Sequence, residues 1–207
     1  MDDKVKVYIK VEEGGRIPEY SSNHSSGCDL FATEDMALRP GETKLMPLKF
    51  SMAVDPGVEA QIRPRSGLSL KTDLRLPNSP GTIDSDYRDM VCVIVQNTYN
   101  SRDLPLMLIS NTSVLKTLRE NYSEILLHDY LVKYCGMDAK EICGLSVLEE
   151  KIYIDSNNNP YGTIYIKKGE RIAQMVFAKY ERADFIPHNN PREIGEDRGG
   201  GFGHSGV

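Results

Sequence analysis

The 207-residue sequence contains no apolar run that approaches the roughly 20 residues needed to span a membrane. Its first four residues, Met1 to Lys4, are charged and lack the apolar segment of a secretion signal. The four cysteines (Cys28, Cys92, Cys135 and Cys143) form no Cys-x-x-Cys pair, so reduced thiols are the default interpretation. We therefore expect an intracellular protein, cytoplasmic or nuclear, that is neither secreted nor bound to a membrane.

The chain also lacks an excess of basic residues, because 25 Lys and Arg face 30 Asp and Glu for a net charge of −5. This balance argues against non-specific binding of nucleic acid, which needs a basic face. A nucleotide substrate is still possible, since a metal ion and a few arginines can neutralise its charge. Tryptophan is absent, which decides nothing. The length suits one domain, with or without an inserted subdomain.

Short stretches of alternating apolar and polar residues dominate both ends of the chain. Val5, Val7, Ile9 and Val11 alternate with polar residues and predict a half-buried first strand. Further strands are expected at 30–32, 44–50, 51–54, 58–62, 163–166 and 171–177, with Pro-Gly turns between several of them. Many short strands of this kind predict a mainly β fold, a sandwich or jelly roll.

The β pattern breaks after Asn97. From Thr112 onward, apolar residues fall at helical spacings up to a stop signal at Gly136. Asp138-x-x-Glu141 resembles a capping box for a second helix that ends at Gly144, and 147–154 fits either a strand or a helix. We interpret 100–160 as a helical insertion in a hairpin with arms at about 91–97 and 163–166.

This interpretation divides the chain into a β domain (1–99 plus 161–195), the insertion (100–160) and a glycine-rich segment (196–207). The leucines and tyrosines of the insertion are expected to form a packing face. That face needs a partner surface, which is the β domain, the second helix or another chain.

Residues 81–88, Gly-Thr-Ile-Asp-Ser-Asp-Tyr-Arg, follow a Pro/Asn/Ser turn and precede the apolar run 90–95. This context predicts the bend and return strand of a β-hairpin. Two carboxylates and a tyrosine at such a bend suit a base, a metal ligand and a stacking surface, although the stretch taken alone favours a simple polar turn.

Two other stretches suit phosphate. Residues 64–71 place Arg65, Ser66 and Gly67 at the start of an expected helical turn, where backbone N–H groups can converge on an anion. A short helix with an exposed arginine is the alternative. The glycine-rich end is either a frayed terminus or a flap that orders on a ligand through one arginine and one phenylalanine.

Five segments in order resemble the five motifs of the homotrimeric dUTP diphosphatases (dUTPases). They are Ser26–Leu30, Pro64–Leu68, Gly81–Arg88, Gly169–Gln174 and Arg198–Gly206. The resemblance covers 5–99 and 161–206. It implies a jelly-roll-like fold and a homotrimer, in which motifs one, two and four of one subunit meet motif three of a second and the flap of the third. The implied reaction is Mg²⁺-dependent hydrolysis of dUTP to dUMP and pyrophosphate.

The resemblance also implies roles for individual residues. Asp84 would be the general base that activates water for attack on the α-phosphorus, and Asp29 would orient waters on a Mg²⁺ held mainly by the triphosphate. The remaining groups would bind substrate. Phosphates would be held by Arg65, Ser66, Gly67, Gln174, Arg198 and Ser205, and the nucleoside by Asn78, Gly81, Thr82, Ile83, Tyr87 and Phe202.

Three departures from the family pattern are visible: Asp89 where glycine is common, Glu170 where aspartate is usual, and one residue fewer between Arg198 and Phe202. Alternatives to a dUTPase are a catalytically idle relative that acts as a binding or regulatory module, an enzyme related to dCTP deaminase, and a structural jelly-roll trimer. The insertion could bind an additional partner.

Overall fold

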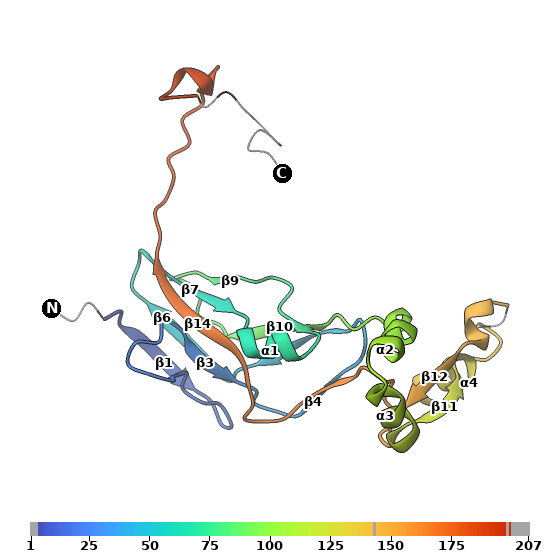
Figure 1. The fold of residues 1–207 in the computed structure, drawn as a ribbon. Helices are drawn as coiled ribbons and strands as arrows, with labels where there is room; N and C mark the ends of the chain where they lie inside the picture. The colour runs from blue at the N-terminus through green and yellow to red at the C-terminus, as the bar shows by residue number, and fades with distance from the viewer. Residues whose placement is uncertain (1–3, 143, 198, 200–207) are drawn as a thin grey trace.

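The computed structural model describes residues 4–142, 144–197 and 199 (Figure 1). Its largest sheet is antiparallel, with strand order β2-β3-β14-β7-β9. The strands of this sheet are β2 (Glu19–Tyr20), β3 (Cys28–Phe31), β14 (Arg171–Lys179), β7 (Val58–Arg63) and β9 (Gly81–Ile83). The sheet therefore unites segments from both ends of the sequence.

Smaller antiparallel pairings complete the β body: β1 with β6, β4 with β13, and β10 with both β5 and β8. Their bounds are β1 (Val7–Val11), β4 (Met36–Leu38), β5 (Thr43–Pro47), β6 (Phe50–Val54), β8 (Leu74–Arg75), β10 (Cys92–Asn97) and β13 (Ile164–Ile166). The fold is mainly β and jelly-roll-like, as the sequence predicted.

Alternation of buried and less buried residues explains why these segments form strands. In β6, β7 and β10 every second residue is buried, and most of these side chains enter one core, which also takes residues from β3 and β14. The predicted strand over 44–50 is divided at Lys49, which has a φ of 54°, while Leu48 and Phe50 on either side of it both hydrogen-bond to the backbone of Val91. The first strand begins at Val7 rather than Val5.

Two hairpin predictions are wrong. The arms flanking the insertion do not pair: β10 lies between β5 and β8, whereas β13 pairs with β4. Likewise β9 pairs with β7 and not with the following strand, β10. Local alternation indicates that a segment is a strand, but the partner of the strand depends on how the sheets pack.

The insertion follows β10 as a short 3₁₀ turn η1 (Ser101–Asp103), then α2 (Leu104–Ser110) and α3 (Ser113–Asn121). The predicted continuous helix up to Gly136 is wrong, because β11 (Ser123–Leu126) interrupts it and pairs with β12 (Lys151–Ile154). Helix α4 (Leu127–Cys135) then ends at Gly136, as predicted, with a φ of 70°.

The second predicted helix, after Asp138, is also wrong. The Asp138 carboxylate accepts a hydrogen bond from the Lys140 N–H and its carbonyl accepts one from Glu141, which makes a turn. The sequence pattern of 147–154 fits either a strand or a helix, and the segment contains both, because η2 (Ser146–Glu149) precedes β12.

A cluster of tyrosines joins the insertion to the β body. The Tyr161 ring makes edge contacts with Tyr99 and Tyr122, at centroid distances of 5.7 and 5.1 Å. Burial raises the pKa of Tyr99 to about 12. The insertion lies at one end of the β body (Figure 1), so part of its apolar face packs against the domain that carries it.

The chain beyond β14 leaves the β body as an extended arm, residues 180–195, that includes η3 (Pro191–Glu193) (Figure 1). Apolar side chains on this arm are exposed, with Phe185 at 89% and Ile186 at 79%. No helix in the part of the chain that the structure describes is both long and apolar enough to cross a membrane.

Candidate active site

Asp29 is the most enclosed charged residue of the candidate site. It lies in β3, with 8% of its surface exposed. One carboxylate oxygen is 2.9 Å from Arg65 Nε, and the other is 3.2 Å from Arg171 Nη1 and accepts a hydrogen bond of 2.9 Å from Ser21 Oγ. Burial alone would raise the pKa of Asp29, but the serine and the two arginines outweigh burial and lower the pKa.

The second motif follows β7 directly and begins α1 (Ser66–Lys71), which confirms the predicted helical turn. Arg65 precedes the helix, and its Nη1 donates to the Arg171 carbonyl at 3.1 Å. Arg65 is therefore held at two points, through Asp29 and through the backbone of β14. Ser66 and Gly67 are exposed at the start of the helix.

Gln174 joins the fourth motif to the first two. Its side-chain amide donates to the Pro64 carbonyl at 2.9 Å, and its backbone lies opposite Asp29 on one side and Arg63 on the other. A Cβ atom added to Gly27 would lie 2.6 Å from Gln174 Oε1. Glycine at position 27 therefore lets the loop before β3 approach this side chain.

These residues surround a polar cavity of about 380 Å³. Its lining consists of Ser21, Ser25, Ser26, Gly27, Asp29, Arg65, Ser66, Gly67 and Gln174. The structure thus brings together five of the predicted site residues: Asp29, Arg65, Ser66, Gly67 and Gln174. A cavity lined by hydroxyls, an arginine and an amide suits an anion with several oxygen acceptors.

The third motif forms a second group of residues at the sheet edge. Gly81, Thr82 and Ile83 make β9, and a Cβ at Gly81 would lie 3.0 Å from Asn78 Nδ2, so the Asn78 side chain folds back over the strand. The alternation of β9 buries Gly81 and Ile83 and exposes Thr82.

Asp84 is exposed and lies directly after β9. The turn that follows is closed by a hydrogen bond from the Tyr87 N–H to the Asp84 carbonyl at 3.1 Å. The Tyr87 hydroxyl donates to the Met90 carbonyl at 3.0 Å, and Arg88 donates to the carbonyls of Ser85 and Tyr87. These contacts fix the ring of Tyr87, which is 40% exposed.

The two groups lie apart within one chain. Strand β7 pairs with β14 on one side and with β9 on the other. Gln174 of β14 lies opposite Arg63, at the end of β7, whereas Ile83 of β9 lies opposite Ala60. Asp84 follows Ile83 and therefore lies near the start of β7. At roughly 3.3 Å per residue along a strand and 4.8 Å between strands, Asp84 is on the order of 15 Å from Gln174. A single phosphate could not contact both residues in this chain.

The departures from the family pattern have local explanations. Among the described non-glycine residues, positive φ values occur at Lys49 and Asn158, so Asp89 keeps an ordinary backbone conformation without glycine. Glu170 accepts a hydrogen bond from the Lys167 N–H at 3.1 Å and closes the turn before β14. Arg198, Phe202 and Ser205 lie outside the described residues, so their assigned roles stay predictions.

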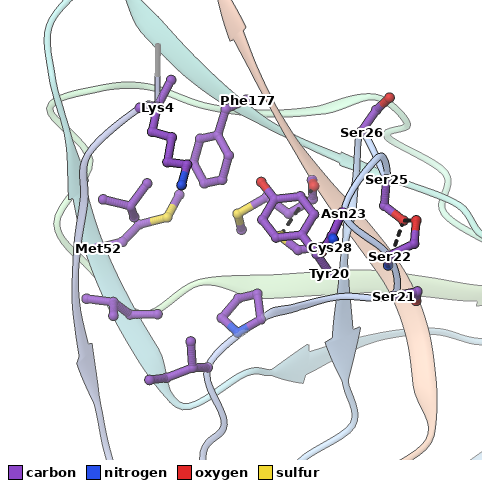
Figure 2. Close-up of a pocket in the computed structure, with 16 residues that line it drawn as sticks. Lys4, Tyr20, Ser21, Ser22, Asn23, Ser25, Ser26, Cys28, Met52 and Phe177 are labelled. Atoms are coloured by element: carbon purple, nitrogen blue, oxygen red, sulfur yellow. Dashed lines mark hydrogen bonds between the residues drawn. The ribbon is translucent and has the colours of Figure 1, made fainter. Parts of the chain in front are cut away.

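A second and larger hollow adjoins the polar cavity. It measures about 760 Å³, and apolar side chains such as Met52, Met175 and Phe177 line it (Figure 2). Both hollows share Ser21, Ser25 and Ser26. The loop 21–26 therefore lies between this larger hollow and the polar cavity. Within this loop the hydroxyls of Ser22 and Ser25 are 2.9 Å apart (Figure 2).

Across the described residues, no group of three or more His, Cys, Asp or Glu side chains is placed to hold a metal ion. Asp29 is the carboxylate that lines the polar cavity, and it already contacts two arginines. Sequence reasoning assigned no role to Ser21 or Arg171. Arg171 stands within the fourth motif, but the serine-rich loop carried no signal that Ser21 contacts Asp29.

Comparisons with known proteins identify the family of this chain. The family model described as dUTPase matches residues 13–103 and 146–206, and leaves out most of the insertion. A deoxyuridine 5'-triphosphate nucleotidohydrolase from Rickettsia bellii is 31% identical over 195 residues, which cover 93% of this chain and 89% of the relative. One from Chlamydia felis is 45% identical over 93 residues, 44% of this chain, and the match spans only 63% of that relative.

Solved structures support the fold. The dUTPase of Staphylococcus bacteriophage 80alpha, solved with dUpNHpp, has a TM-score of 0.67 at 21% identity and covers 98% of this chain and 99% of its own. The dUTPase of S. aureus phage phi11, described as having a species-specific insert, has a TM-score of 0.60 at 18% identity over 89% of this chain and 97% of its own. On the family match and the Rickettsia relative together, the chain belongs to the dUTPase family.

Proposed function

We propose that this protein hydrolyses dUTP to dUMP and pyrophosphate in a Mg²⁺-dependent reaction. The observation that carries the proposal is the polar cavity, where Arg65, Ser66, Gly67 and Gln174 converge from separate parts of the sequence. The cavity offers donors for phosphate oxygens, and membership of the dUTPase family provides the substrate class. A protein whose name is deoxyuridine 5'-triphosphate nucleotidohydrolase aligns along nearly the whole chain.

Mg²⁺ fits this site only as part of a substrate complex. The ion prefers six oxygen ligands, and the cavity supplies one carboxylate, Asp29, whose charge two arginines already balance. We infer that triphosphate oxygens and water hold the ion, with Asp29 orienting some of that water. When bound, Mg²⁺ would neutralise phosphate charge and favour departure of pyrophosphate.

Asp84 is proposed as the general base. Its carboxylate is exposed at the end of β9, so water and substrate can reach it. The turn closed by the Tyr87 N–H holds its backbone in place. A carboxylate in this position can accept the proton of an attacking water once the bound substrate orients that water.

Asn78, Tyr87 and the backbone of β9 are proposed to select deoxyuridine. The Tyr87 ring, fixed through its hydroxyl to Met90, can pack against deoxyribose and leave no room for a 2′-hydroxyl. The Asn78 amide and the edge of β9 offer donors and acceptors for the uracil ring. A close-fitting strand edge at β9 would exclude the 5-methyl group of thymine by its size.

The proposed assembly is a homotrimer with active sites shared between subunits. Its support within the chain is the distance between the two groups of site residues, since Asp84 and Gln174 of one chain cannot act on the same phosphate group. We infer that the adjacent Phe185 and Ile186, 89% and 79% exposed on an arm that leaves the β body, also contact another copy.

The test is pyrophosphate release from dUTP, measured beside dCTP, dTTP and UTP, with and without Mg²⁺. Rapid turnover of dUTP alone, abolished by EDTA and restored by Mg²⁺, is the expected result. Absence of turnover by a folded oligomer would contradict the proposal and favour a catalytically idle binding module. Release of ammonia from dCTP would instead indicate a relative of dCTP deaminase.

A further inference from the structure

We propose that Ser21 and Arg171 are positioning residues that hold the Asp29 carboxylate against Arg65, and so aim the Arg65 guanidinium into the polar cavity. The inference rests on the proposed function, because it assigns to these residues an effect on triphosphate binding. Asp29 and Arg65 line the cavity, whereas Arg171 binds Asp29 without lining the cavity.

The geometry divides the Asp29 carboxylate between its partners. One oxygen faces Arg65 Nε at 2.9 Å, and the other receives Ser21 Oγ at 2.9 Å and Arg171 Nη1 at 3.2 Å. A carboxylate held on one oxygen can rotate about its side-chain bonds. Donors on the second oxygen, from a loop and from β14, remove that freedom and keep the first oxygen toward Arg65.

Arg65 depends on this anchoring because its own backbone lies at the junction of β7 and α1. Its Nε is engaged by Asp29 and its Nη1 by the Arg171 carbonyl at 3.1 Å. Those two contacts set the plane of the guanidinium, which decides whether its donors match phosphate oxygens. Arg171 therefore supports Arg65 twice, through its side chain on Asp29 and through its backbone carbonyl.

The charges of the cluster also favour this role. Asp29 is negative and lies in a cavity proposed to bind a triphosphate, so alone it would repel the substrate. With Arg65 and Arg171 the cluster has a net positive charge. The side chain of Arg171 is 51% exposed, so its position beside Asp29 is not forced by burial. The contact is best explained by what it does for Asp29.

The experiment is a double-mutant cycle. Ser21→Ala and Arg171→Gln are made alone and in an Asp29→Asn background, and steady-state kinetics with dUTP are measured. Each single variant is expected to raise KM about tenfold and to change kcat less than about threefold, since the lost contact serves substrate binding. In the Asp29→Asn background the same substitutions should change KM less than about twofold.

Matched variants separate positioning from general effects. Ser22→Ala removes a hydroxyl from the same loop that contacts Ser25 and not Asp29, and it should leave KM within about twofold. Ser21→Thr keeps the hydroxyl and should restore most of the affinity. Arg171→Lys keeps the charge but loses the guanidinium geometry, so positioning predicts incomplete rescue, whereas a purely electrostatic role predicts full rescue.

Additive effects in the cycle, or equal effects of Ser21→Ala and Ser22→Ala, would overturn the proposal. If Asp29→Asn fails to fold, Arg65→Gln replaces it as the background. Because Ser21 and Arg171 are proposed to act on substrate binding through Arg65, their substitution should not change KM in that background either. Should the wild-type protein not hydrolyse dUTP, the same cycle is measured by calorimetric binding of inorganic tripolyphosphate. Failure of the proposed function would appear as absence of dUTP hydrolysis by the wild type, whereas failure of this inference would appear as additive effects in the cycle.

Discussion

At the residue scale, the two carboxylates proposed for the active site lie in opposite environments. Asp29 is enclosed and contacts two arginines and a serine, while Asp84 is exposed at the end of a strand. The first is suited to hold other groups in place, and the second to exchange a proton with water. Their surroundings therefore support different roles for the same functional group.

Replacing Asp84 tests the base assignment. Asp84→Asn keeps the shape of the side chain but removes the proton acceptor, so we expect kcat to fall by about 10²–10⁴ with a smaller change in KM. Asp86→Asn, an exposed carboxylate in the same turn, is the matched control and should stay within about twofold. Turnover by Asp84→Asn within a few-fold of wild type would refute the assignment.

The environment of Asp29 predicts a pH dependence of stability. Its folded-state pKa is lowered from the ordinary value of 3.8, so its ion pairs and hydrogen bonds stabilise the fold above that pH. This contribution is lost as pH falls below 3.8 and through the folded-state pKa.

The difference in free energy of unfolding between wild type and Asp29→Asn should therefore be about 2 kcal/mol at pH 7 and shrink toward pH 2. Urea unfolding at one protein concentration measures it. A difference that does not change with pH would contradict the assignment of these contacts to the ionised carboxylate.

At the scale of elements, the insertion is joined to the β body by close packing around Gly162. Gly162 has a φ of 89°, and a Cβ there would lie 2.2 Å from Cδ1 of Tyr99. The buried Asn97 amide donates to the Gly162 carbonyl at 2.8 Å and to the Leu38 carbonyl at 2.9 Å. This junction sets where the chain returns from the insertion.

Gly162→Ala should therefore destabilise the protein far more than Gly57→Ala. Gly57 has nearly the same φ, 88°, but nothing lies within 4 Å of its added Cβ, so only backbone strain is expected, about 1 kcal/mol. At Gly162 the clash with Tyr99 adds to the strain, and we expect about 3 kcal/mol in total. Thermal or urea unfolding compares the two, and equal losses would show that the contact with Tyr99 is unimportant.

At the scale of the whole molecule, shared active sites predict complementation. Asp84→Asn and Arg65→Gln each disable one of the two groups of site residues, so neither variant alone should hydrolyse dUTP efficiently. If the groups come from different subunits, randomly mixed trimers contain sites with both groups intact. With equal mixing, about a quarter of the sites qualify, so activity should recover toward that fraction.

The control is a mixture of Asp84→Asn with Tyr87→Ala, which disable the same group and should not complement. Light scattering at micromolar concentration gives the mass of the assembly. Absence of recovery after verified subunit exchange, or a monomer by light scattering, would contradict the shared-site arrangement.

Much of this protein was determined by its sequence alone. Alternating residues in β6, β7 and β10 predicted strands because one face of each must be buried. The resemblance to the dUTPase motifs implied that motifs one, two and four of one chain meet, and Asp29, Arg65, Ser66, Gly67 and Gln174 from these motifs line one polar cavity. Gly136 ended its helix as expected, because its left-handed conformation disfavours other residues.

Only the tertiary structure decided which strands pair and what holds the site in place. The apolar spacing near 122–126 predicted a helix, but the chain forms β11 there, because pairing with β12 satisfies its backbone N–H and C=O groups. β10 and β13 lie in different sheets, although the sequence suggested a hairpin. The contact between Ser21 and Asp29 follows from the path of a loop. Strand pairing and such contacts are long-range, and local patterns record only which face of a segment is buried.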